Sequence, residues 1–382
     1  MAVLNEEQSM LRDAAKSWVQ EKSPVTAFRK MRDSGVELGY DAAAWNEQAE
    51  MGWAGVIIPE DFGGSNFGYL SMGLILEEMG RTLTASPLLA SGLAAASALI
   101  LGGNDAQKAE HLPKIADGSL VATLAVDEGP HHAPEKVALT ADKGGAGVSG
   151  GYVLNGKKTF VLEGPGAGLF VVSARTSGKP GDKDGVSLFL VPADAKGVSK
   201  QNLKQADSRG VSNVSFDNVE VPAGALLGAE GKGWDVLEAT LDRARAGVAA
   251  EMLGAAVQAF ETTLDYLKVR VQFGQVIGSF QALQHRAAKM FTDLELARSA
   301  VEAALAAIDA GSPDVPELVS LAKAKMGDVF HLVSNEMVQM HGGIGMTDAH
   351  DAGFYLKRAR AAEAAYGSQS YHRDRYARIQ GY

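Results

Sequence analysis

The sequence contains no cysteine in its 382 residues. This absence excludes disulfide bonds, thiolate nucleophiles, iron–sulfur clusters and cysteine-ligated zinc. Basic side chains are also in the minority, because 36 lysines and arginines stand against 46 aspartates and glutamates, for a net charge of −10. Nucleic acids bind basic surfaces, so this balance argues against nucleic acid as the main partner. It leaves room for a small anion held by a few local arginines.

Long hydrophobic runs are also missing. The longest uncharged apolar stretch, 88–101, is rich in alanine, serine and glycine, and it is shorter than the ~20 residues that span a bilayer. The N-terminus carries Glu6 and Glu7 where a signal peptide carries basic residues. We therefore expect a buried helix over 88–101, no membrane span and a cytoplasmic location.

The chain reads as a helical block, a β block and a second helical block. Hydrophobic residues make up 46% and charged residues 21%, which is the balance of a globular enzyme. Between about 120 and 225, short β-type runs alternate with Gly, Pro, Asn and Asp, without helical stretches, which predicts an antiparallel sandwich or barrel. The predicted runs are 121–126, 152–154, 158–162, 170–173, 186–191 and 214–221. From Trp234 onward the helical period returns, with one apolar face formed by Leu237, Leu241, Ala244, Val248 and Met252.

Two matches to nucleotide-binding motifs fail on their context. The G-x-G-x-x-G of residues 145–150 precedes a predicted strand, whereas the motif requires a helix whose N-terminus faces a pyrophosphate. Residues 151–157 nearly match a P-loop, but Lys158 stands where a hydroxyl must meet Mg²⁺. His131 and His132 have no further ligand at metal-binding spacing, so we expect a solvated loop and no metal site.

Three segments carry more information. In 270–281, Arg270 and Gln272 stand at a predicted corner between two helices, where a guanidinium can pair with a phosphate. In 339–346, adjacent glycines end a helix and allow a ligand or another backbone to approach closely. In the β block, 124–130 and 155–160 are suited to wall a flat heterocycle.

The joint order of these and further segments resembles the acyl-CoA dehydrogenase family over essentially the whole chain. The similar segments are 101–113, 155–158, 207–210, 216–222, 227–233, the R-x-Q-F-G of 270–274 and the Q-x-H-G-G-x-G of 339–345. The resemblance implies an α+β fold with an N-terminal α-helical domain over 1–119, a middle antiparallel β-domain over 120–228 and a C-terminal four-helix-bundle domain over 229–382.

The resemblance also implies that FAD lies between subunits of a homo- or hetero-oligomer, either a dimer or a tetramer. The matching positions for the pyrophosphate and adenine half are Arg270, Gln272, Phe273 and Gln281, together with Gln339, Gly342 and Gly343. A guanidinium and several N–H groups that face a diphosphate form charge-assisted bonds at little organising cost.

On the flavin side the sequence departs from the family pattern. Val126 and Phe160 fall at positions that contact the flavin, and the Phe160 ring can stack on it. Ala133 and Leu162 stand where the family has hydroxyl side chains, and neither can donate a hydrogen bond. Asp127 near the flavin pyrimidine would oppose an anionic reduced flavin.

The family's catalytic carboxylate is missing from both of its usual positions. The reaction needs a base that removes the proton α to a thioester. The two positions are occupied by Tyr366 and Ala244, and a phenol with a reference pKa near 10 is a poor base at neutral pH. Glu363 is a weak alternative candidate. Arg245 matches a position near the substrate, as does Tyr366.

Two functional hypotheses follow from the resemblance. In the first, the chain desaturates an acyl-CoA thioester by hydride transfer to FAD, with an unrecognised base and an electron-transfer flavoprotein as acceptor. In the second, it is non-catalytic: either the structural or FAD-sharing subunit of a heteromeric dehydrogenase, or a scaffold that binds CoA without chemistry.

Overall fold

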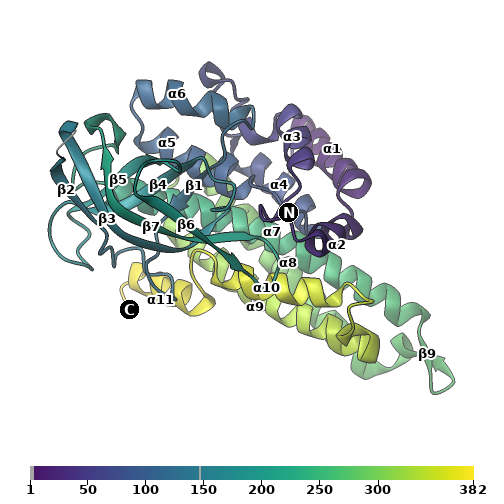
Figure 1. Ribbon diagram of the computed structural model, residues 1–382. Helices are drawn as coiled ribbons and strands as arrows, with labels where there is room; N and C mark the ends of the chain where they lie inside the picture. The colour runs from purple at the N-terminus through teal and green to yellow at the C-terminus, as the bar shows by residue number, and fades with distance from the viewer. Residues whose placement is uncertain (1–3, 146–147) are drawn as a thin grey trace. The chain divides into compact units, whose positions relative to one another are not determined.

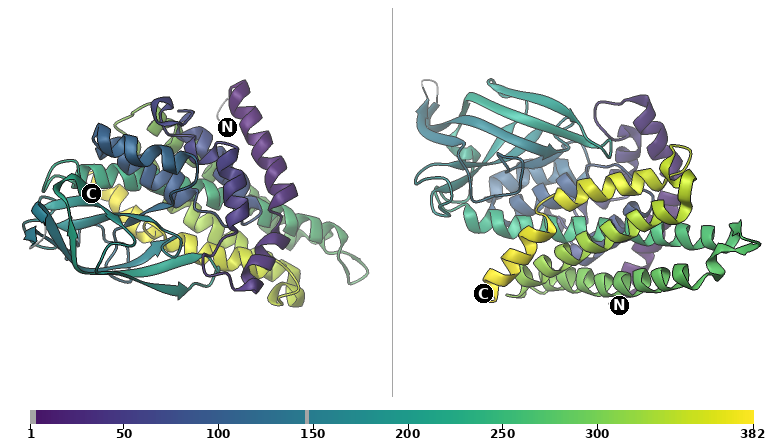
Figure 2. Two further views of the ribbon diagram at one scale, coloured as in Figure 1. Left: turned by 45° about the horizontal axis from the view of Figure 1, so that its top comes forward. Right: turned by 90° about the horizontal axis from the view of Figure 1, so that it is seen from below.

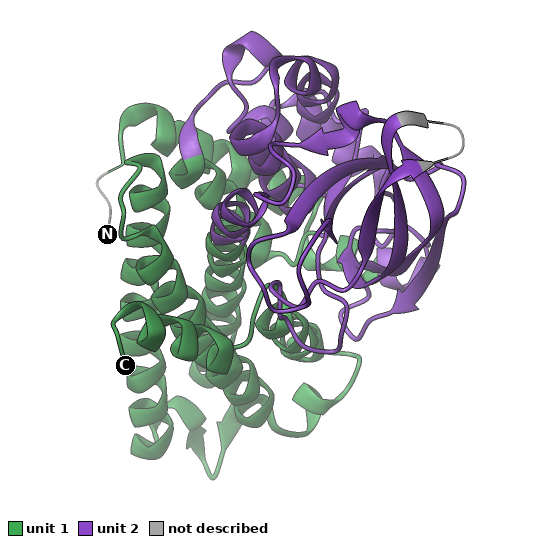
Figure 3. Ribbon diagram, turned by 90° about the vertical axis from the view of Figure 1, so that its left-hand side faces the viewer, with its two compact units in different colours: residues 1–30, 69–84, 245–382 green, residues 31–68, 85–244 purple. Residues whose placement is uncertain are grey.

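The computed structural model describes residues 4–145 and 148–382, and Figure 1 labels its helices and strands. Contacts divide the chain into two compact units, coloured separately in Figure 3. Unit 1 comprises 1–30, 69–84 and 245–382, and unit 2 comprises 31–68 and 85–244. The helices α2 (Val25–Ser34) and α7 (Trp234–Val269) each contribute residues to both units. Among the described residues, no helix is long and apolar enough to cross a membrane.

Unit 1 is mainly helical. Its other helices are α1 (Glu6–Lys22), α4 (Gly68–Arg81), α8 (Gln281–Asp309), α9 (Val315–His341), α10 (Ala352–Ala364) and α11 (Gln369–Ile379). A hairpin of β9 (Val271–Gln272) and β10 (Gln275–Val276) joins α7 to α8. Figure 2 shows α8 and α9 running alongside one another, and α10 and α11 also pack on α9. The helical period predicted from Trp234 onward is confirmed.

Within unit 1, reciprocal glycine contacts bring α4 close to α7. A Cβ at Gly80 would lie 2.0 Å from the Glu251 carbonyl oxygen, and a Cβ at Gly254 would lie 1.7 Å from the Glu77 carbonyl oxygen. Each helix therefore packs directly on the backbone of the other. Beside this contact, buried Arg358 of α10 donates to both carboxylate oxygens of buried Glu251, at 3.0 and 2.9 Å.

Unit 2 combines short helices with one sheet. Its helices include α3 (Ala42–Glu50), the π-helical segment η3 (Leu89–Ala95), α5 (Ala96–Gly102) and α6 (Asp105–Ala116). Residues 88–99 are all buried, which confirms the buried helix predicted over 88–101. Asn104 caps α6 by accepting from the Gln107 N–H at 2.9 Å, while the Gln107 side chain accepts from the Asn104 N–H.

The sheet has eight strands in the order β6-β7-β3-β2-β4-β5-β8, with β1 paired to β4. The strands are β1 (Ala122–Ala125), β2 (Thr140–Gly145), β3 (Val148–Leu162), β4 (Leu169–Arg175), β5 (Val186–Pro192), β6 (Val198–Lys204), β7 (Gly210–Val221) and β8 (Leu226–Leu227). Its core contains Phe170, Phe189 and Val214.

The sheet differs from the expected antiparallel arrangement around β4. Most pairs are antiparallel, but β1 runs parallel to β4, because the intervening β2–β3 excursion is long enough for a crossover. The strand β2 also pairs with β4 in parallel, at Thr140 and Arg175. The runs predicted at 152–154 and 158–162 belong to one strand, β3. The rejected G-x-G-x-x-G match includes Ala146 and Gly147, which lie outside the described residues. The strand β3 begins within the match at Val148, where the motif requires a helix to follow.

Replacing Gly254 by alanine should destabilise the protein by about 3 kcal/mol or more, because the new methyl group meets backbone rather than a movable side chain. Gly353→Ala in α10 is the matched control, since no atom lies within 4 Å of a Cβ at that position. Urea unfolding of both variants checks this. Equal midpoints for the two variants would contradict the close helix contact.

Candidate functional site

The turn between α10 and α11 holds Tyr366 in a strained backbone conformation. The φ angles of Tyr366 and Gly367 are +53° and +114°, and Ser368 then caps α11 by accepting from the Tyr371 N–H. A left-handed φ is unusual for a bulky residue and needs surrounding structure to enforce it. Of the sequence-predicted site residues, Phe160 and Phe273 share this feature, with φ of +52° and +53°.

Buried Arg245 contacts this turn directly. Its Nε donates to the Tyr366 carbonyl oxygen at 3.3 Å, and its Nη2 donates to the Tyr371 hydroxyl at 3.2 Å. The Nε2 atom of His372 lies 3.1 Å from the same Tyr366 carbonyl. The structure therefore brings together Arg245 and Tyr366, which are 121 positions apart in the sequence. Both lie in unit 1.

A second buried cation, Lys323 of α9, reaches the same turn. Its Nζ donates to the carbonyl oxygens of Ala362, Glu363 and Gly367 at 3.1, 3.1 and 3.0 Å. Burial lowers the pKa of Lys323 to about 7, an effect that the Glu363 carboxylate opposes and that Arg245 and Arg358 reinforce.

The carboxylate of Glu363 is bound on the side of α9. Its Oε1 accepts from Arg360 Nη1 at 2.6 Å and lies 3.0 Å from His331 Nδ1. A carboxylate held by a guanidinium and an imidazole is less available as a base than one that faces a substrate. This arrangement counts against Glu363 as the missing base.

The hairpin between α7 and α8 presents its side chains to solvent. Phe273 at its tip is 91% exposed and meets Phe280 edge-on at 6.1 Å. Arg270, Gln272 and Gln281 are also exposed. Among the described residues, no side chain caps the N-terminus of α8, where Phe280 occupies the N-cap position. Free N–H groups beside an exposed guanidinium suit a diphosphate.

The glycine segment after α9 lies near the end of α7. Tyr266 stacks on His341 with ring centroids 4.4 Å apart, and His341 immediately precedes Gly342. Gly342 has a φ of +64°, and neither it nor Gly343 would place a Cβ within 4 Å of another group. The backbone of this segment is therefore open to a ligand. Gln339, one turn earlier, is exposed.

In unit 2, Phe160 projects from a bulge in β3. The pairing of β3 with β7 shifts register between Lys158 and Val161, and Phe160 within this bulge is 49% exposed. Bulges of this kind re-aim side chains and are common beside active sites. Thr159 ties the bulge to the preceding loop through its N–H, which donates to the Asp127 carbonyl at 2.7 Å.

The loop from Asp127 to Ala133 is held by its own carboxylates. Asp127 accepts from the Ala133 N–H at 3.1 Å and lies 2.9 Å from His132 Nδ1. The Asp127 carboxylate is thus used within the loop. The described parts of the chain contain no group of three or more histidine, aspartate or glutamate side chains suited to a metal ion.

Beneath this loop, fully buried Lys158 donates to Glu128 at 2.7 Å, to Ser173 at 2.9 Å and to the Val126 carbonyl at 2.9 Å. Burial lowers the pKa of Lys158, and Glu128 opposes that shift. The side chain of Val126 is buried, so only its backbone remains as a candidate contact for a flavin.

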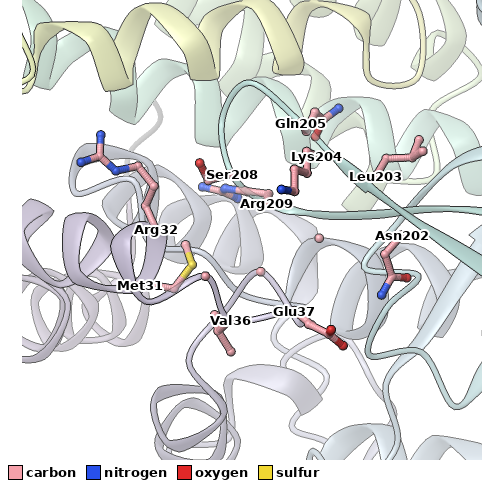
Figure 4. Close-up of a pocket in the computed structure, with 13 residues that line it drawn as sticks. Met31, Arg32, Val36, Glu37, Asn202, Leu203, Lys204, Gln205, Ser208 and Arg209 are labelled. Carbon is pink, nitrogen blue, oxygen red and sulfur yellow. The ribbon is translucent and has the colours of Figure 1, made fainter.

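Unit 2 also has a pocket of about 520 Å³ between 31–39 and the 202–210 segment (Figure 4). Arg32, Lys204 and Arg209 line it together with Glu37. None of the site residues predicted from the sequence borders this pocket.

Lys323 contacts the turn at Tyr366 but is not among the site residues predicted from the sequence. A signal was present, because Lys323 lies four residues after Val319 and three before Met326, both on the buried face of α9. A lysine on an apolar helix face must be neutralised or well bonded, and this one is bonded to three carbonyls.

Comparisons with known proteins cover nearly the whole chain. Residues 5–119, 133–219 and 231–380 match the models for the acyl-CoA dehydrogenase N-terminal, middle and C-terminal domains. Acryloyl-CoA reductase (NADH) of Anaerotignum propionicum is 31% identical over 375 residues, which is 97% of this chain and 93% of that protein.

Two solved structures share the fold. Butyryl-CoA dehydrogenase from Megasphaera elsdenii superposes with a TM-score of 0.91 at 26% identity, covering 100% of this chain and 99% of that one. A chain of the ChsE4–ChsE5 complex from Mycobacterium tuberculosis gives a TM-score of 0.89 at 26% identity, with the same coverage.

The chain belongs to the acyl-CoA dehydrogenase family. Members of this family are FAD-dependent flavoprotein oxidoreductases, so the α+β fold, the enzyme class and the cofactor predicted from the sequence are confirmed.

The described residues fit FAD unequally. The positions predicted for the adenine half present an exposed guanidinium at Arg270 and open glycines at Gly342 and Gly343. The ring half finds the exposed face of Phe160, but Ala133 and Leu162 offer no hydroxyl group.

The pKa of Lys323 predicts a pH effect on stability. The folded protein releases this proton near pH 7, whereas the unfolded chain holds it to about 10.5, so the unfolded state binds more protons between these values. Stability should therefore rise with pH across this window, by up to about 1.4 kcal/mol per pH unit. Lys323→Met should lack this contribution. Urea unfolding of both proteins from pH 6 to 9 measures it, and parallel curves would contradict the assigned pKa shift.

Proposed function

We propose that this chain is the subunit of a two-chain acyl-CoA dehydrogenase that binds an acyl-CoA thioester and the adenine half of FAD but supplies no catalytic base. The observation that carries this proposal is the absence of a carboxylate from both base positions, which hold Tyr366 and Ala244. When bound, FAD would supply the acceptor for the β-hydrogen of the acyl group, which leaves as hydride. A related second chain supplies the carboxylate that removes the α-proton.

The geometry around Tyr366 supports a binding role rather than a proton-transfer role. Arg245 and Lys323 fix the carbonyl oxygens of the turn, so the backbone at 366–367 is held in one arrangement. A thioester carbonyl needs such a fixed backbone for orientation, and this contact does not depend on the side chain at 366. The half-buried Tyr366 and the buried Arg245 are the substrate-side residues of this chain.

On the cofactor side, we assign Arg270, Gln272, Phe273 and Gln281 to the pyrophosphate and adenine of an FAD shared with a neighbouring subunit. The exposure of Arg270 and Phe273 on the hairpin supports this assignment, since both side chains are directed to solvent and open to a second chain. Gln339, Gly342 and Gly343 present their backbone to the same FAD. We assign Val126 and Phe160 to the contact of this chain with the flavin ring.

One comparison also supports a division of the site between two chains, because the ChsE4–ChsE5 structure is described as a complex of two named proteins. The further assignments of the proposal are a dimeric or tetrameric assembly, an electron-transfer flavoprotein as acceptor, a cytoplasmic location, and domain boundaries at 1–119, 120–228 and 229–382.

A second candidate function is desaturation by this chain alone with Glu363 as base. The observation in its favour is position, because Glu363 lies in the last turn of α10, three residues before Tyr366. It would require the carboxylate to leave Arg360 and His331.

The cofactor assignment predicts that Arg270→Ala lowers FAD retention. The diphosphate would lose a charge-assisted contact worth about 1.5–3 kcal/mol, which is roughly a 10- to 150-fold weaker affinity. Lys268→Ala, two residues earlier and also exposed, should retain FAD like the unmodified chain. Flavin absorbance per chain after gel filtration measures this. Unchanged flavin content in Arg270→Ala would show that Arg270 does not hold the diphosphate.

The base assignment predicts that the isolated chain loaded with FAD is reduced very slowly by butyryl-CoA without oxygen, because positioned proton transfer contributes about 10²–10⁴-fold. Tyr366→Glu should speed the loss of flavin absorbance, and Glu363→Gln should leave it unaltered. Stopped-flow absorbance near 450 nm follows the reaction. Rapid reduction of the unmodified chain, abolished by Glu363→Gln, would establish the second candidate instead.

A further inference from the structure

The last carbonyl groups of α10 accept hydrogen bonds from two sources, the following turn and the helix α9. A helix leaves its final four carbonyl oxygens without intrahelical partners unless the following turn supplies them. Here the Ala361 and Ala364 carbonyls accept from the Ala365 and Gly367 N–H groups. The Ala362 and Glu363 carbonyls accept from Lys323 instead, which donates to them from a different helix.

The third bond from Lys323 crosses the turn. By donating to the Gly367 carbonyl at 3.0 Å as well, the Nζ atom joins the residue after Tyr366 to the helix end before it. An ammonium group has three N–H donors, and Lys323 directs all three to carbonyl oxygens of this one turn. The positive charge also lies at the negative end of the α10 dipole.

We propose that Lys323 is a positioning residue whose ammonium group clamps the two sides of the 362–367 turn and thereby enforces the left-handed backbone conformation of Tyr366. The proposal rests on the proposed function only for what the turn does, namely the orientation of a thioester. The clamp itself follows from contacts within unit 1.

Two features separate this role from ordinary core packing. The side chain of Lys323 is 1% exposed, and a hydrophobic residue would fill that space at lower desolvation cost. Lys325, two residues later on α9, forms an ion pair with Asp293 at 2.6 Å and makes none of the contacts to this turn. Lys325 therefore serves as a matched control on the same helix.

The test is hydrogen–deuterium exchange of the full-length chain without added ligand, near pH 6, where Lys323 carries its proton. Lys323→Met should raise the exchange rate of the Ala365 and Gly367 amides by about tenfold or more, because the turn loses three charge-assisted bonds. Lys325→Met should leave that peptide unchanged. If Lys323→Met does not fold, Lys323→Gln takes its place. Because glutamine keeps two N–H donors, this variant should raise the exchange rate of the same two amides by about threefold or more.

Exchange in the turn within about twofold of the unmodified chain would overturn the proposal. So would a rate increase that extends equally through α8 and α9, because Lys323 would then be a general core residue. The affinity of each variant for butyryl-CoA, measured by calorimetry, separates this inference from the proposed function. A loosened turn with unchanged affinity supports the clamp and contradicts the assignment of the turn to the substrate.

Discussion

Buried lysine and arginine side chains in each unit donate to main-chain carbonyl oxygens, and the loops that carry several candidate site residues depend on these bonds. In unit 1, Arg245 and Lys323 donate to carbonyl oxygens of the turn at Tyr366. In unit 2, Lys158 donates to the Val126 carbonyl. Arg175 donates to the carbonyls of Val137 and Asp182. Burying a cation is costly unless its donors are satisfied. If a loop that provides these carbonyl oxygens moved away, the buried cation would lose its hydrogen-bond acceptors, which is energetically unfavourable.

The sequence predicts the helical blocks, most strands and the family, because these depend on periodic burial and on local motifs. It does not predict β6 (Val198–Lys204), which is largely exposed and lacks the alternation of a half-buried strand. The contact of Glu363 with His331 and those of Lys323 with the 362–367 turn also escape prediction, since these residues lie 32 to 44 positions apart along the chain. No local sequence pattern predicts the left-handed backbone conformation of Phe160, Phe273 and Tyr366.

The two halves of the cofactor site differ in what they retain. On the proposed adenine side, the guanidinium of Arg270 is exposed and the backbone at Gly342 and Gly343 is open, and groups of this kind can bind a diphosphate. On the proposed flavin side, Ala133 and Leu162 offer no hydroxyl donor, and Tyr366 places a phenol at the position predicted for the base. A subunit that binds the cofactor while another chain performs the proton transfer needs the groups that bind the diphosphate. It does not need its own catalytic base.

Native mass spectrometry of the chain expressed alone tests this division most directly, because it counts FAD molecules and protein chains in the same particle. The chain alone should carry less than one FAD per chain, with full occupancy only when a related chain that carries the catalytic glutamate is present. A homo-oligomer with one FAD per chain that also oxidises butyryl-CoA rapidly would contradict it.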